Sequence, residues 1–135
     1  MQQINTLSHA DVIKIINAVS QEFESKGLKA AAAVSDAHGE LLGFIRADGC
    51  PLTSINVAIN KAFTAARERQ QSKAIGDRTG SPRFHMTNYG DIRYVAWGGG
   101  VPIMYKGECV GGIGVSGLSE DEDIAIASMG AALVV

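Results

Sequence analysis

The stretch that decides the fold is Val110-Gly111-Gly112-Ile113-Gly114-Val115-Ser116-Gly117. Successive side chains of a strand point to opposite faces of a sheet, so Gly112 and Gly114 share one face. Ile113 and Val115 lie on the opposite face, where they predict a buried apolar layer. Because glycine has no Cβ, another backbone or a flat ligand can approach the bare face closely. The pattern leaves open whether a helix, a ligand or a partner subunit uses that space.

The residues from Gly112 to Gly117 also match the pattern G-x-G-x-x-G of dinucleotide-binding folds. In those folds the pyrophosphate binds at the N-terminus of the helix that follows the glycines. Here the next helix begins with Glu120-Asp121-Glu122-Asp123, whose four carboxylates repel a phosphate but stabilise the start of a helix. The stretch is therefore interpreted as a strand, and nucleotide binding is not predicted.

A second glycine-rich stretch, Trp97-Gly98-Gly99-Gly100-Val101-Pro102-Ile103, precedes this strand. Three consecutive glycines predict a bend in which backbone, rather than side chains, lies near a ligand. The N–H groups of Gly98, Gly99 and Gly100 are candidates for an anion-binding nest. The two glycine-rich stretches together predict the location of a binding site.

Helices are predicted before, between and after the strands. The S-x-x-D capping box at residues 8–11 starts a helix whose apolar residues recur at helical spacing until Gly27. A second amphipathic helix begins near Thr53, and the S-x-x-E box at residues 119–122 starts the last one. A long polar connection is expected over Gln71–Asp91.

Five short apolar runs predict strands, and the first two form a hairpin around Asp36-Ala37-His38-Gly39. The alanines of the first run favour a strand only if a helix packs tightly over their small side chains. The order of elements predicts one α+β domain over residues 1–135, a single five-stranded antiparallel sheet with helices packed on it, in a profilin-like arrangement. The predicted strands are Lys29–Ser35, Glu40–Arg46, Ile92–Trp97, Val101–Tyr105 and Cys109–Ser116.

The composition is that of an ordinary globular domain. The chain has 135 residues, of which 46% are hydrophobic and 19% charged, with a net charge of -2. Binding to nucleic acid is not predicted, because it needs a broad basic surface. Cys50 and Cys109 lie too far apart in sequence for a C-x-x-C motif. The sequence shows neither a signal peptide nor a membrane-spanning run, so we predict a cytoplasmic protein without membrane contact.

The histidines and a few charged residues are the candidates for chemistry. His85 is the best candidate for a metal ligand, because it lies in the long connection next to Met86; the alternative is a plain loop residue. Arg46, Asp48 and Lys61 are candidates for binding a substrate, and Lys61 would meet an anionic group of the ligand. A structural pair of Asp48 with Lys61, or of Arg46 with a carboxylate, is the alternative. No catalytic residue is identified.

Five motifs in this order resemble the GlcG/HbpS-like family, a haem-binding or haem-degrading domain family. That domain is also the C-terminal domain of PduO-type cobalamin adenosyltransferases. The resemblance extends from about Leu7 to Ala132 and implies an antiparallel sheet with packed helices that assembles into homo-oligomers. It also implies haem as a cofactor, although the matched motifs contain no fixed histidine ligand. The motifs are Val34–Gly39, Arg46–Gly49, Asn60–Ala65, Gly98–Ile103 and Val110–Gly117.

Three functions are therefore predicted as alternatives. The first is a haem- or tetrapyrrole-binding protein, in haem handling or redox sensing, with an apolar slot between the glycine strand and the second helix. The second is an accessory or enzymatic protein of small-molecule catabolism that binds an oxygenated metabolite. In the third, the glycines serve only an oligomer interface. The predicted cofactor-binding residues are Lys61, His85, Gly98, Gly99, Gly100, Pro102, Gly112 and Gly114.

Overall fold

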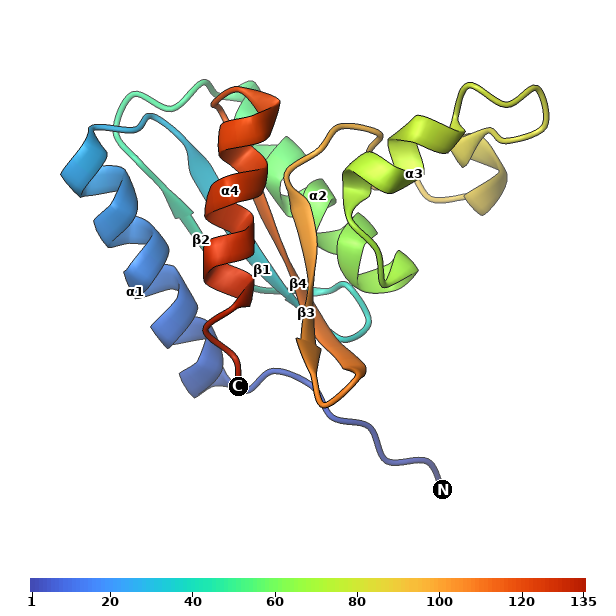
Figure 1. Ribbon diagram of the computed structural model, residues 1–135, viewed down its shortest axis with the longest axis horizontal. Helices are drawn as coiled ribbons and strands as arrows, with labels where there is room; N and C mark the ends of the chain where they lie inside the picture. Colours follow the sequence, from blue (N-terminus) through green and yellow to red (C-terminus); the bar gives the residue numbers. More distant parts are fainter.

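The protein contains one antiparallel sheet of four strands in the order β2-β1-β4-β3 (Figure 1). The computed structural model describes residues 1–135. β1 and β4 are the central strands, and β2 and β3 form the two edges. Pro102, which cannot donate a backbone hydrogen bond, lies on an edge strand, where that donor is least needed. The strands are β1 (Ala31–Asp36), β2 (Leu41–Arg46), β3 (Gly100–Tyr105) and β4 (Glu108–Ser116).

Helices cover both faces of the sheet. α1 (His9–Lys26) and α4 (Glu120–Ala131) lie side by side on one face, and α2 (Thr53–Glu68) lies on the other (Figure 1). Large aliphatic side chains fill the layer under α1 and α4, whereas alanines and glycines dominate the layer under α2. The buried residues of the first layer include Ile15, Val19, Val34, Ile113 and Val115.

The predicted helix starts are confirmed. Ser8 and Asp11 form a reciprocal capping box at α1, and Ser119 and Glu122 form one at α4. α1 ends at Gly27, which has the left-handed φ of 61° that glycine adopts readily. Local capping therefore sets where the two helices of the aliphatic layer begin.

The predicted hairpin of β1 and β2 is also confirmed. The Asp36 carboxylate accepts hydrogen bonds from the N–H groups of His38 and Glu40 and closes the turn. Ala31 and Ala33 are fully buried against Ala58 and Ala62 of α2. Close packing of this helix compensates for the weak strand propensity of alanine, as the sequence required.

The predicted strand over Ile92–Trp97 is wrong, so the sheet has four strands rather than five. Side chains take the hydrogen bonds that a strand ladder would use: Arg93 N–H donates to the nearby Asp91 carboxylate, and Val95 N–H donates to the Thr64 hydroxyl of α2. Such side-chain acceptors compete with regular secondary structure. The long connection before this segment contains the short helix α3 (Ser72–Arg78) and the 3-10 helix η1 (Met86–Tyr89).

None of the helices combines the length and the apolar character that crossing a lipid bilayer requires.

Candidate functional site

The bare glycine face of β4 is covered by α2. A Cβ placed on Gly112 would overlap the carbonyl oxygen of Ala62, and one on Gly114 would overlap that of Ala58. The helix backbone therefore fills the space that the absence of side chains creates. The predicted apolar slot between the glycine strand and the second helix does not exist in this structure. Because both glycines are buried inside the chain, they cannot form an oligomer interface either.

The bend at Gly98–Gly100 is held by side chains of the protein. Gly98 N–H donates to Glu120 Oε2 at 3.0 Å, and Gly100 N–H donates to Ser72 Oγ at 2.8 Å. Gly99 has a left-handed φ of 119°, and its carbonyl accepts a hydrogen bond from Val115 N–H. Two of the three donors of the predicted anion nest are thus used within the fold, so the nest is not open to an anion.

Lys61 is buried at the end of this bend. Its side chain leaves α2, and its Nζ donates to the Val115 carbonyl at 2.8 Å and to Asp123 Oδ2 at 3.0 Å. The residue is only 2% exposed and Asp123 only 3%, and no other charged residue is buried. Burial raises the pKa of the Asp123 carboxyl, although the Lys61 ammonium opposes the shift. The alternative pair of Asp48 with Lys61 is therefore wrong, because the partner of Lys61 is Asp123.

A cleft of about 430 Å³ opens above this ion pair. We call it the Lys61 cleft. It lies between the N-terminal turns of α2 and α4 and the glycine bend, and the exposed Trp97 is part of its wall. Polar and apolar groups both contribute to its lining, which consists of Pro51, Thr53, Ser54, Lys61, Trp97, Gly98, Ser116, Gly117, Leu118, Glu120 and Asp123.

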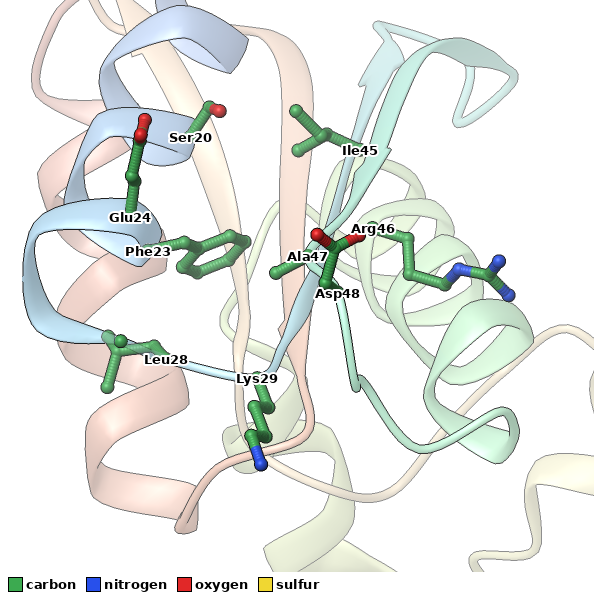
Figure 2. Close-up of a pocket in the computed structure, with 10 residues that line it drawn as sticks. Ser20, Phe23, Glu24, Leu28, Lys29, Ile45, Arg46, Ala47 and Asp48 are labelled. Atoms are coloured by element: carbon green, nitrogen blue, oxygen red, sulfur yellow. The ribbon is translucent and has the colours of Figure 1, made fainter.

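Arg46 and Asp48 belong to a different cleft, which lies between the C-terminal end of α1 and the end of β2. Figure 2 shows Phe23 facing Ala47 across this cleft of about 460 Å³, while the Arg46 guanidinium points away from Phe23. Arg46 forms no ion pair, so its predicted pairing with a carboxylate is wrong. The structure does not bring Arg46 and Asp48 together with Lys61 in one site.

His85 is exposed and directly precedes η1. The connection that carries α3 and η1 extends away from the sheet at the right of Figure 1. Phe84, the residue before His85, packs edge to face on Tyr89. The Arg78 guanidinium lies over the Phe84 ring. His85 lines none of the larger hollows of the molecule, so its role as a metal ligand stays a prediction.

The structure shows a further hollow that the sequence did not suggest. We call it the hairpin-end hollow, because it lies where the turns of both hairpins approach the N-terminal segment; its volume is about 530 Å³. His38, Met104 and Cys109 contribute an imidazole, a thioether and a thiol, and Arg69 adds a guanidinium. Burial raises the pKa of the Cys109 thiol. The pairing of Asp36 with Gly111 brings the two turns together, and only the sheet register reveals this.

A comparison with known protein families finds a match over most of the length of the chain. The family model described as "Haem degrading protein HbpS-like" matches residues 7–132. The chain belongs to the HbpS-like family. This confirms the resemblance seen in the five sequence motifs.

Relatives with similar sequences are known from several bacteria. The chain is 31% identical over 128 residues to an uncharacterized 15.0 kDa protein in the dhaT-dhaS intergenic region of Citrobacter freundii, which covers 93% of this chain and 90% of that protein. It is also 31% identical to protein GlcG of Escherichia coli, over 82% of this chain and 81% of GlcG. Each of these two proteins matches the chain over more than four fifths of its own length.

Solved structures have the same fold. A double mutant of Streptomyces reticuli HbpS superimposes with a TM-score of 0.89 at 29% identity and covers 100% of this chain and 91% of that one. The structure named PduOC:Heme Complex superimposes with a TM-score of 0.86 at 25% identity, over 96% of this chain and 95% of that one. The corrinoid adenosyltransferase PduO of Salmonella typhimurium is 25% identical, and the chain spans 39% of it. The α+β fold is therefore shared across the family.

Proposed function

We propose that this protein binds haem and that the hairpin-end hollow is its site. Membership of a family described as haem-degrading supports the proposal. So does the 25% identical PduOC structure, which was solved as a haem complex. The observation on this chain that carries the proposal is the lining of the hollow, where an imidazole without a hydrogen-bond partner lies with an unpaired guanidinium.

His38 and Met104 are the side chains best suited to bind the iron. The backbone N–H and carbonyl of His38 make hydrogen bonds to Asp36 and Arg67, but its ring makes none, so a ring nitrogen is free to bind a metal. Met104 is exposed on the edge strand β3 and offers a thioether sulfur. Histidine and methionine are both established haem ligands. Cys109 is a weaker candidate, because its thiol donates to the Gly111 carbonyl and its raised pKa disfavours the thiolate.

Basic side chains are placed to pair with the propionates of haem. A second hollow of about 300 Å³ shares His38 and Arg69 with the first and adds Arg67. Arg69 forms no ion pair within the chain, so its guanidinium is free to pair with a carboxylate. Both volumes fall in the range of about 300–1,000 Å³ that is usual for small-molecule sites.

Bound haem would supply an iron centre that changes oxidation state and binds small ligands, which suits haem handling or redox sensing. His38 would hold the iron, and Arg69 would orient the macrocycle through its propionates. His85 is the alternative ligand that the sequence predicts.

Titration of the protein with haemin tests the proposal. We expect a saturable Soret band near one haem per chain, with its position shifted or its intensity lost in His38→Ala and much less affected in His85→Ala. His9→Ala is the matched control, because His9 is an exposed histidine at the start of α1 that lines neither the hairpin-end hollow nor the hollow beside it. A Soret band unchanged in His38→Ala and Met104→Leu but altered in His85→Ala would move the site to the η1 connection. No saturable band in the wild type would refute haem binding.

Self-association is a further part of the proposed function. β2 is an edge strand with unpaired backbone groups, and its residues Leu41 and Leu42 expose apolar side chains. Exposed apolar edge strands are templates for pairing with another chain. We propose that this edge contacts a second copy of the protein. Both cysteines are free thiols, which supports a reducing, cytoplasmic compartment.

A further inference from the structure

The hydroxyl of Ser116 faces the Lys61 cleft and has no hydrogen-bond partner in the fold. The residue is 7% exposed at the end of β4 and lines the Lys61 cleft, yet its Oγ makes no hydrogen bond. Three other buried hydroxyls are bonded to backbone carbonyls: Ser35 to Ala62, Thr64 to Asn60 and Ser72 to Trp97. Ser54, which is buried and lines the same cleft, has no such bond either. The cleft thus contains two serine hydroxyls that make no hydrogen bond to a carbonyl of the chain and are available to a ligand.

The Lys61 ammonium offers a second group for a ligand. An ammonium carries three N–H donors, and only two acceptors surround it, the Val115 carbonyl and the Asp123 carboxylate. Lys61 is among the residues that line the cleft, so its third donor is available to a ligand there. Ser116 and Lys61 together provide adjacent hydrogen bonds for one or two oxygen atoms of a ligand.

The charge of the cleft selects against an anion. Lys61 and Asp123 neutralise each other, and the remaining charged lining residue is Glu120, a carboxylate. Asp121 and Glu122 follow in the same helical turn and make the surrounding field more negative. The predicted role of Lys61 in holding an anionic group therefore does not fit its surroundings. A ligand with oxygen atoms but no charge does fit.

Trp97 provides an apolar wall beside these polar groups. Its side chain is 65% exposed, and it is the single tryptophan of the chain. Sites for polar small molecules commonly combine a few placed hydrogen-bonding groups with an aromatic surface. The C–H face of a sugar-like molecule can contact the indole while its hydroxyls reach Ser116 and Lys61.

We infer that the Lys61 cleft binds a small, uncharged molecule rich in hydroxyl groups, of the size of a tetritol or a pentose. Ser116 and Lys61 bind its oxygens, and Trp97 contacts its carbon face. This site is separate from the hairpin-end hollow and does not depend on haem.

The fluorescence of Trp97 reports occupancy of the cleft directly. We would titrate the haem-free protein with erythritol and xylose, and in parallel with glycolate as an anion and ethanolamine as a cation. We expect a saturable change in emission for an uncharged ligand. In Ser116→Ala the affinity should fall about fivefold, the value of one hydrogen bond of about 1 kcal/mol. Ser20→Ala is the matched control, because Ser20 lines the separate cleft of Figure 2.

Saturation-transfer NMR gives a second measurement that does not need the tryptophan. We expect transfer from the protein to erythritol or xylose in the wild type and its loss in Trp97→Ala, a substitution at an exposed position that leaves the core unchanged. Equal affinity in the wild type and Ser116→Ala, tighter binding of glycolate or ethanolamine, or no response to either uncharged compound would each overturn the inference.

Discussion

The two faces of the sheet are packed in opposite ways by the same central strands. Toward α2, β1 and β4 present Ala31, Ala33, Gly112 and Gly114, and the backbone of the helix rests almost directly on the backbone of the strands. Toward α1 and α4 most of the alternate residues are larger aliphatic ones, including Val34, Ile113 and Val115. One face is stabilised by close approach, and the other by the apolar volume it buries.

This difference explains where polar groups are tolerated. The aliphatic layer contains no buried charge, whereas the ion pair of Lys61 and Asp123 lies at the end of the close-packed layer. There the glycine bend removes side chains and exposes backbone carbonyls, and the Val115 carbonyl accepts one of the Lys61 hydrogen bonds. Close packing of small residues thus places a buried lysine beside a cleft without leaving it unpaired.

The largest effect on stability is expected from a substitution that disrupts the close-packed face. In Gly114→Val the new side chain would overlap the Ala58 carbonyl and would lie near Ala62 N, which are backbone atoms of α2 that cannot move separately. We expect a loss of more than about 4 kcal/mol in the free energy of unfolding, with little folded protein. Circular dichroism and size-exclusion chromatography of the purified variant measure this.

The matched control for this substitution is Gly80→Ala. A Cβ at Gly80 meets no atom within 4 Å, and its φ is not in the left-handed region. We expect a stability within about 0.5 kcal/mol of the wild type. If Gly114→Val folded with near wild-type stability, α2 would not rest on the glycine face, and the predicted slot would be open again.

The second prediction concerns the replacement of Lys61, the buried positive charge at the close-packed layer. Lys61→Met leaves the buried Asp123 carboxylate without its partner, so we expect a loss of about 3–5 kcal/mol, measured by urea denaturation. Adding Asp123→Asn removes the unpaired charge and keeps an acceptor for Leu118 N–H. The double variant should recover at least half of that loss. Equal stability of the single and double variants would mean that the ion pair does not exist in solution.

The sequence predicts most of the fold, because local rules determine those parts. Capping boxes place the starts of α1 and α4, and the Asp36 turn places the hairpin. The alternation of glycine with aliphatic residues in β4 also predicts that one face is closely approached. It does not identify what approaches it, because a helix and a flat ligand need the same bare surface.

The sequence-based predictions that failed concern structure that depends on contacts between segments distant in sequence. Ile92–Trp97 has the composition of a strand, but the Thr64 hydroxyl, contributed by α2, takes a hydrogen bond that a sheet neighbour would need. The partner of Lys61 lies 62 positions away on α4. His38 and Met104 meet only because the two hairpins end at the same side of the sheet. Periodicity and spacing along the chain carry no information on which distant residues come into contact.

The smallest expected effect on stability concerns the part of the sheet that α2 leaves uncovered. Leu42 lies on the edge strand β2 with 43% of its surface exposed. Leu42→Lys should change the free energy of unfolding by no more than about 0.5 kcal/mol, because the side chain is not in the core. If this edge binds a second copy, burying a lysine there without a partner weakens the contact, so the mass in solution should fall toward that of one chain.

Light scattering coupled to size-exclusion chromatography measures that mass. Leu52→Lys is the control, because Leu52 is also an exposed leucine, 74% exposed, but precedes α2 and belongs to no strand. Assembly lost in Leu42→Lys and kept in Leu52→Lys would assign the interface to the edge that α2 does not cover. Assembly unchanged in both variants would exclude β2 as the contact between copies. The packing of α2 on the sheet would then affect only the interior of one chain and not its assembly.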